Sequence, residues 1–164
     1  MAIQKKILVA YFSCSGTTRA VAESLADVLG ADLHEITPAV PYTPADLNWR
    51  DKQSRSSIEM ADRSFRPAIT GDVANMNDYE VVFVGFPIWW YTAPTIIHTF
   101  LESYDFSGKT IVLFATSGGS GFGKTAENFG SSVSPTAKIV EGKLLNGSLS
   151  KEESAAWVEG LRLR

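Results

Sequence analysis

Three apolar runs along the chain are nearly continuous instead of alternating with polar residues. They are KILVAYF at 6–12, EVVFVGF at 80–86 and KTIVLFA at 109–115, and each is rich in β-branched residues. Strands of this kind are covered on both faces, as in a parallel sheet. The shorter runs ADLHEI at 31–36 and AKIVEGKLL at 137–145 predict two further strands.

Helical spacing separates these strands. Residues 20–29 place their apolar side chains on one stripe, and Gly30 follows as a stop. The same spacing recurs over 93–101, with Pro94 expected in the first turn, where its missing N–H is not needed. Two helices are therefore expected to pack against the sheet.

The end of the chain carries weaker helical signals. KTAENFG at 124–130 is one, and Ser150 with Glu153 forms a capping box that opens a last helix. Five strands alternating with helices predict an α/β fold with an open, doubly wound parallel five-stranded sheet. A chain of 164 residues that is 45% hydrophobic fits a single domain spanning 1–164.

Residues 41–68 form a polar, charged excursion that is too long for a plain connection. We expect it to contain a helix and to project over a sheet edge. It is either a solvated surface segment or a wall over a ligand. The second interpretation depends on Trp49, a large apolar side chain in a polar context.

The first strand is followed directly by hydroxyl side chains and a glycine, Ser13-Cys14-Ser15-Gly16-Thr17-Thr18, and then by a helix that starts near Arg19. A helix N-terminus offers free N–H donors and about half a positive charge, which suits a phosphate group. Ordinary helix capping also attracts serine, threonine and glycine. Four hydroxyls and a glycine within six positions favour the phosphate site.

This stretch resembles the phosphate loop of flavodoxins, which bind flavin mononucleotide (FMN). Ser13, Ser15, Gly16 and Thr18 match the family's Thr/Ser-x-Thr/Ser-Gly-x-Thr pattern in order. The resemblance implies a flavodoxin-like sheet with strand order 2-1-3-4-5 and FMN as cofactor. It also implies that Thr17 and the backbone N–H of Cys14 join the phosphate site.

Three adjacent aromatic residues follow the strand at 80–86, in the loop Pro87-Ile88-Trp89-Trp90-Tyr91. Successive side chains cannot all face one core, so at least one tryptophan is expected to stack on a flat ring. GFPIWWYTAP resembles the flavin-flanking loop of flavodoxin-like proteins. In the family that the chain resembles, one-electron chemistry often uses a peptide flip beside the flavin, which is cheapest at glycine. This loop has no glycine, and that departure counts against a long-lived neutral semiquinone.

A glycine-rich loop follows the strand at 109–115. By resemblance to the family, Thr116, Ser117, Gly118 and Gly119 hydrogen-bond the flavin pyrimidine. Residues 118–125, GGSGFGKT, also match the nucleotide-binding pattern G-x-x-x-x-G-K-[ST]. A nucleoside triphosphatase would need a later strand that ends in a magnesium-binding Asp, and no Asp follows Thr125.

A dinucleotide-binding pattern is matched as well, at Gly121, Gly123 and Ala126, with Glu141 about where a ribose-binding acid would lie. A dinucleotide-binding fold would need several more strands downstream. We interpret both this match and the triphosphatase match as chance results of glycine-rich composition.

Composition narrows the class of partner. The net charge is −3, with basic and acidic residues mixed along the chain, so neither nucleic acid nor a membrane is expected as partner. The single Cys14 cannot form an internal disulfide, and a catalytic role for its thiol is disfavoured because no histidine or second cysteine is near in sequence. His34 and His98 are expected to be ordinary structural or surface residues, no metal is expected, and the cytoplasm is the expected location.

The fold and the cofactor do not determine which molecule receives the electrons or whether the protein is a carrier or an enzyme. Our first hypothesis is an FMN-dependent electron-transfer protein that serves a redox partner protein or a small acceptor. An NAD(P)H-dependent quinone-type oxidoreductase is the alternative, and a non-redox FMN-binding or interaction module is the remote one. In each case the flavin, and no side chain, would carry the chemistry.

Overall fold

The computed structural model describes most of the chain. The described residues are 6–14, 16–48, 50–62, 64–71, 73, 75–89, 92–116, 129, 132–144, 152, 155–157 and 159.

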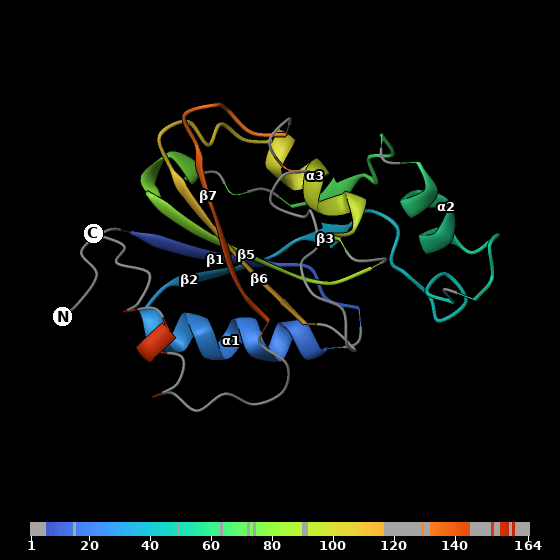
Figure 1. Ribbon diagram of the computed structural model, residues 1–164, viewed down its shortest axis with the longest axis horizontal. Helices are drawn as coiled ribbons and strands as arrows, with labels where there is room; N and C mark the ends of the chain where they lie inside the picture. Colours follow the sequence, from blue (N-terminus) through green and yellow to red (C-terminus); the bar gives the residue numbers. More distant parts are fainter. Residues whose placement is uncertain are drawn as a thin grey trace.

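A five-stranded parallel sheet forms the centre of the fold, with strand order β2-β1-β5-β6-β7 (Figure 1). Counted along the chain among these five strands alone, this order is the predicted 2-1-3-4-5. All five predicted strands are confirmed. Their bounds are Ile7–Tyr11 for β1, Asp32–Glu35 for β2, Val81–Pro87 for β5, Thr110–Thr116 for β6 and Lys138–Leu144 for β7.

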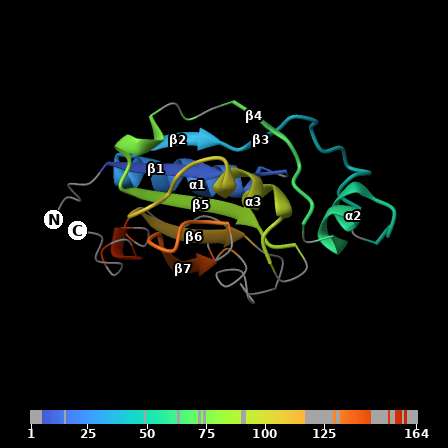
Figure 2. The same cartoon turned by 90° about the horizontal axis from the view of Figure 1, so that it is seen from above.

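Helices cover both faces of the sheet in the part of the chain that the structure describes. Helix α1 (Thr17–Leu29) lies on one face and α3 (Thr95–Glu102) on the other (Figures 1 and 2). Both helices were predicted, but α1 begins two residues earlier than expected. Pro94 is the N-cap of α3 and not a first-turn residue, because its ψ of 147° is extended.

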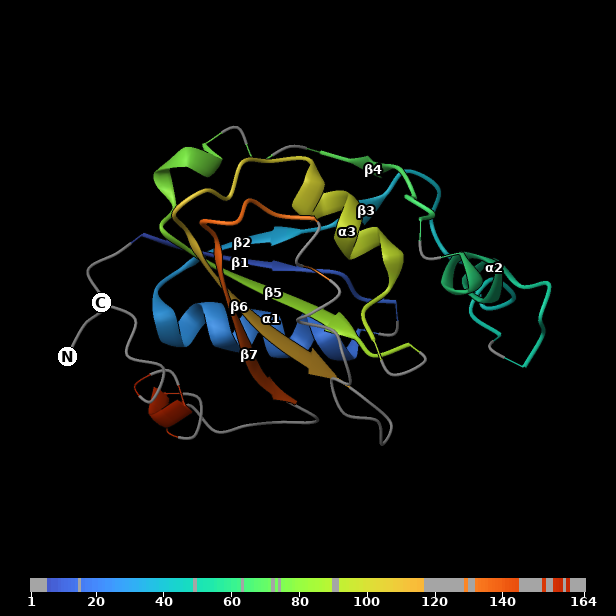
Figure 3. The ribbon, with the colours of Figure 1, turned by 45° about the horizontal axis from the view of Figure 1, so that its top comes forward.

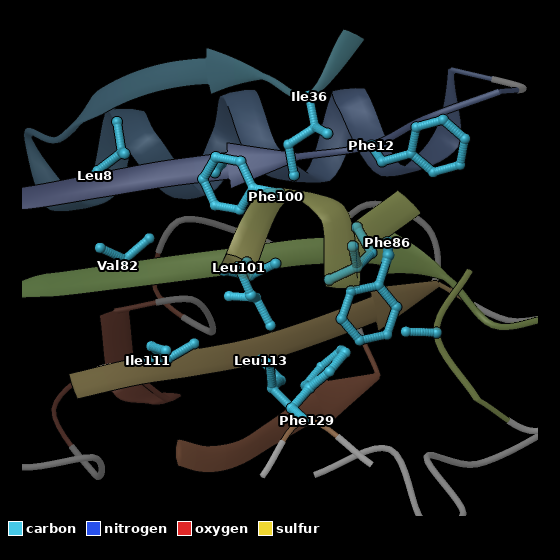
Figure 4. Close-up of a cluster of buried hydrophobic side chains, with 14 of the residues drawn as sticks. Leu8, Phe12, Ile36, Val82, Phe86, Phe100, Leu101, Ile111, Leu113 and Phe129 are labelled. Atoms are coloured by element: carbon cyan, nitrogen blue, oxygen red, sulfur yellow. The ribbon is translucent and has the colours of Figure 1, made fainter. Parts of the chain in front are cut away.

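Two apolar cores lie between the sheet and these helices. The alternation of side chains along β1 places Leu8, Ala10 and Phe12 against the α3 side and Ile7, Val9 and Tyr11 against the α1 side. Figure 4 shows Phe12 and Phe86 toward the ends of the strands where the arrows point, and Leu8 and Val82 toward the opposite ends. Covering on both faces explains why these strands are apolar throughout.

The excursion begins and ends on a second, two-stranded sheet, in which β3 (Thr37–Pro38) pairs antiparallel with β4 (Ile69–Thr70). Within the excursion, α2 spans Arg55–Ala61, and the Ser54 hydroxyl accepts a hydrogen bond from the Ser57 N–H. The predicted helix is therefore confirmed. The segment was expected to project over a sheet edge, and the structure shows α2 beyond the carboxyl ends of the strands (Figures 2 and 3).

The remaining described elements are small. A 3₁₀ turn, η1, spans Met76–Asp78 before β5. Near the end of the chain, Ala155 to Trp157 are helical, and the Trp157 ring contacts Phe83 edge-on at a centroid distance of 5.9 Å. The proposed capping box at Ser150 and Glu153 lies outside the described residues, as does the predicted helix at 124–130 except for Phe129.

Candidate functional site

Three loops meet where the direction of winding changes between β1 and β5. The chain leaves β1 toward β2 and later returns to β5 on the other side of β1, which is the place where open α/β sheets hold ligands. Two hydrogen bonds tie these loops together. The Ile88 N–H donates to the Thr116 carbonyl at 2.9 Å, and the hydroxyls of Thr18 and Thr116 lie 2.8 Å apart.

The first loop presents an open helix N-terminus. Gly16 is the N-cap of α1 with φ 90°, a left-handed conformation that glycine adopts without steric cost. Since glycine has no side chain, it offers no acceptor to the first-turn N–H groups, and that turn contains no acidic residue. Among the described residues, apart from its chain neighbours and the backbone of α1, no atom lies within 4 Å of a Cβ placed at Gly16. These features suit an anion.

The hydroxyls of this loop differ in what they contact. Ser13 is half-buried and accepts a hydrogen bond from the Gly16 N–H at 3.1 Å, which shapes the turn. Thr17 is exposed and is the first residue of α1. Thr18 is 2% exposed and its hydroxyl pairs with Thr116, so its side chain joins two loops rather than lining an open site. Ser15 lies outside the described residues.

The loop after β5 forms a tight turn. Trp89 and Thr92 exchange two backbone hydrogen bonds of 2.8 and 3.1 Å, and Trp89 is half-buried. Pro87 ends β5, and Ile88 packs against the core on the α3 side. These two bonds fix the backbone at Trp89, and the Trp89 ring contacts Phe12, the residue that precedes the first loop. The neighbouring Trp90 and Tyr91 lie outside the described residues.

The third loop is described only at its start. Thr116 ends β6 and is 5% exposed. Ser117, Gly118 and Gly119 lie outside the described residues, and so does the remainder of the triphosphatase match at 120–125. The dinucleotide match at Gly121, Gly123 and Ala126 lies there as well.

Sequence reasoning missed a cluster that the excursion brings to the site: Tyr42, Arg55 and Glu59. The Tyr42 ring contacts Trp89 and Phe12, and its hydroxyl donates to the Glu59 carboxylate. The expected wall was assigned to Trp49, which lies outside the described residues. The Arg55–Glu59 ion pair could have been predicted, because the two residues have the i, i+4 spacing of ion pairs within a helix.

Cys14 lies in the first loop and is half-buried. Burial raises the pKa of its thiol to about 12, while the nearby Arg55 lowers it and Glu59 raises it by smaller amounts. The thiol therefore favours its protonated form near neutral pH, which is not the nucleophilic form.

Both histidines belong to the packed part of the structure. The His34 ring stacks on Phe100 at 6.0 Å, and His98 Nδ1 lies 2.7 Å from the Ser132 hydroxyl, which donates to Glu102. Within the described ranges, no three His, Cys, Asp or Glu side chains gather in a way that could hold a metal ion. In the same part of the chain, no helix combines the length and the apolar character needed to cross a bilayer.

Comparison with known proteins agrees with this architecture. Residues 6–161 match the protein family described as flavodoxin. A candidate flavoprotein from Bacteroides eggerthii DSM 20697 is 48% identical, with a TM-score of 0.92 over 98% of this chain and 100% of that chain. One from Bacteroides uniformis ATCC 8492 is 44% identical, with a TM-score of 0.88 over 94% and 98%.

A more distant structure, a flavoprotein from Lactobacillus acidophilus NCFM in complex with FMN, is 23% identical, with a TM-score of 0.67 over 94% of this chain and 99% of that chain. At that identity the likeness extends to the fold alone. The search of curated proteins gave no match. Since the family match covers all five strands of the parallel sheet and every described residue that we assign to the site, the chain belongs to the flavodoxin family.

Proposed function

We propose that this protein binds one FMN non-covalently at the carboxyl ends of β1, β5 and β6 and transfers electrons through it. One observation carries the proposal: the glycine-capped N-terminus of α1 and the Trp89 turn lie at the same switch point. An anion site and an aromatic wall are the two surfaces that a phosphorylated flat ring requires.

The phosphate end of the site would be formed by the first loop. Its N–H groups around Gly16, with the side chains of Ser13, Ser15 and Thr17, supply donors without a lysine or arginine. The Thr18 side chain would act indirectly, by holding the loop to Thr116, while its backbone N–H remains a first-turn donor. This assignment rests on the chemistry of the donors.

The ring end of the site would be formed by the Trp89 turn and the loop after Thr116. When bound, the flavin supplies the electron transfer, and the protein supplies position and electrostatics. Trp89 would orient the ring and exclude water, with Pro87, Ile88, Trp90 and Tyr91 completing the turn. Ser117, Gly118 and Gly119 would offer backbone hydrogen bonds to the polar edge of the ring.

A two-electron role is the second candidate, namely NAD(P)H-dependent reduction of a quinone-type acceptor. The observation that favours it is the mild net charge of −3, since docking between carrier proteins is commonly steered by a strong charge. For either role we propose one domain over residues 1–164, a cytoplasmic location, and no nucleic acid or membrane partner.

Stoichiometric reduction separates these roles. The FMN-loaded protein is reduced anaerobically, and its spectrum is followed against the number of electrons added. NAD(P)H oxidation is then measured with and without a quinone. Turnover that depends on the quinone indicates a reductase, whereas reduction without turnover indicates a carrier. Absence of a flavin spectrum after loading and desalting would contradict the proposed function itself.

A further inference from the structure

Three aromatic side chains from three parts of the chain pack edge to face beside the site. Tyr42 contacts Trp89 at a centroid distance of 5.8 Å and an interplanar angle of 70°, and it contacts Phe12 at 5.5 Å and 65°. Phe12 contacts Trp89 at 5.8 Å and 81°. Because edge-to-face packing fixes the orientation of each ring, the Trp89 ring is oriented by its two neighbours.

Tyr42 is itself held from two sides. Its hydroxyl donates to Glu59 Oε1, and the Arg55 guanidinium lies over its ring, 3.8 Å from the centroid. Arg55 Nε donates to Glu59 Oε2 at 2.9 Å, and its Nη1 donates to the Val40 carbonyl at 2.6 Å. Helix α2 is thereby attached to Tyr42 and to the backbone just before it.

The positive charge of Arg55 balances the negative charge of Glu59. Glu59 is 2% exposed, and a buried carboxylate is costly unless a cation and hydrogen bonds compensate it. Arg55 provides the cation, and Tyr42 provides a further donor. The effects of both charges reach Cys14 in the first loop, where Arg55 lowers the pKa of the thiol and Glu59 raises it. The pair is thus within electrostatic range of the candidate phosphate site.

We propose that Tyr42 is a positioning residue that holds Trp89 at the flavin site, and that the Arg55–Glu59 ion pair anchors Tyr42 while keeping this wall electrically neutral. The inference rests on the proposed function and extends it, since it assigns the excursion a role in setting both flavin affinity and flavin potential. Tyr42, Arg55 and Glu59 all lie outside the three loops that resemble the flavodoxin family.

The positioning role is tested with Tyr42→Ala and Tyr42→Phe. Loss of the ring should weaken FMN binding about tenfold, since two aromatic contacts that orient Trp89 are removed. The phenylalanine variant keeps both ring contacts and should bind within about twofold of wild type. Affinity is measured by quenching of flavin fluorescence, and apoprotein melting is recorded for each variant. Affinity that is unchanged in Tyr42→Ala would overturn this role.

The electrostatic role is tested with Glu59→Gln and Arg55→Gln, read out as the two-electron midpoint potential of the bound flavin. Glu59→Gln leaves a cation beside the site and should raise the potential, because the reduced flavin is the more negative form. Arg55→Gln leaves a carboxylate and should lower it. A purely structural role would instead shift both variants in the same direction or leave both unshifted, and either result overturns the proposal.

Glu102→Gln controls for the loss of an Arg–Glu ion pair outside the site; Glu102 is more exposed than Glu59, at 39% against 2%. The substitution breaks another Arg–Glu pair, Arg66–Glu102, at the last residue of α3 and so at the other end of that helix from the Trp89 turn. It should leave the potential unchanged. If Arg55→Gln does not fold, Glu59→Gln decides alone: a rise supports the proposal and no rise overturns it. Wild-type protein that fails to bind FMN would contradict the proposed function, which is a separate result from these.

Discussion

The hydroxyl oxygens of Thr18 and Thr116 lie 2.8 Å apart in the interior, although the two residues are 98 positions apart along the chain. This hydrogen bond joins the first turn of α1 to the end of β6. It therefore couples the candidate phosphate loop to the loop expected at the polar edge of the flavin. Both positions were predicted as site residues, but their contact with each other was not.

Replacing both threonines should destabilise the protein by less than the sum of the two single replacements. Thr18→Val or Thr116→Val keeps the shape but leaves the other buried hydroxyl unpaired, at a cost of about 1–3 kcal/mol. In the double variant neither hydroxyl remains, so its loss should be smaller than the sum of the two single losses. Urea denaturation of the four proteins measures this, and strictly additive losses would show that the bond does not contribute.

A glycine in the left-handed conformation lies at each end of α1, so Gly16→Ala can be compared with Gly30→Ala. Gly16 has φ 90° and Gly30 has φ 63°, and in the described part of the chain a Cβ at either position would meet no atom within 4 Å beyond its local backbone. Alanine should therefore cost about 1–2 kcal/mol of backbone strain in each case. FMN affinity should fall in Gly16→Ala alone, since Gly30 is at the opposite end of the helix. Equal affinity in the two variants, measured by fluorescence titration, would argue against phosphate binding at the first loop.

The architecture could be predicted because each central strand carries its signal locally. The runs at 6–12, 80–86 and 109–115 are apolar on both sides, and a parallel sheet covered by two helices is what such strands require. The first loop was predicted for the same reason, since Ser13 to Thr18 are contiguous. Strands β3 and β4 have two residues each, which is too short for a sequence pattern, so the small sheet was missed.

The cluster around Tyr42 could not be predicted because its contacts are long-range. Nothing in the local sequence indicates that Tyr42 meets Phe12 and Trp89, which lie 30 and 47 positions away along the chain. The excursion was recognised as unusual from its length and polarity. Its place beyond the carboxyl ends of the strands depends on where β3 pairs with β4, and that pairing leaves no periodic pattern.

The buried thiol of Cys14 predicts how the stability of the protein changes with pH. Its pKa is raised from 9.0 to about 12 in the folded protein, chiefly by burial. The raised value means that the folded state favours the protonated thiol. This contribution to stability is complete below about pH 9 and is lost as pH rises toward 12. Cys14→Ala should lack that part of the alkaline destabilisation, and an identical decline in both proteins would contradict the assignment.

Alkylation reports on the same group kinetically. Iodoacetamide reacts with the thiolate, so modification of Cys14 in the folded protein should be slow at pH 8 and should become fast in denaturant. A folded protein that is modified as quickly as the denatured one would show that the thiol is exposed and ordinarily ionised.

Trp89 should affect both affinity and potential. An apolar wall disfavours the anionic reduced flavin, so the two-electron potential of bound FMN should lie below that of free FMN. Trp89→Ala should weaken FMN binding by roughly 1–3 kcal/mol, with aromatic stacking on nucleotide bases as the analogue, and should raise the potential. Apoprotein melting is the control, because loss of packing against Phe12 and Tyr42 is also expected to destabilise the fold. Unchanged affinity and potential would remove Trp89 from the flavin site.

The central claim is that one FMN binds through its phosphate at the first loop, and a comparison of three flavins tests it most directly. Apoprotein is titrated with FMN, riboflavin and flavin adenine dinucleotide, and the dissociation constants are determined from flavin fluorescence. Riboflavin lacks the phosphate and should bind at least about tenfold more weakly than FMN, since a charge-assisted hydrogen bond contributes roughly 1.5–3 kcal/mol. The dinucleotide adds adenosine monophosphate, which turns the terminal phosphate into a diphosphate with less charge on the inner phosphate and more bulk beyond it, so it should also bind at least about tenfold more weakly. Riboflavin or the dinucleotide binding as tightly as FMN would contradict the account.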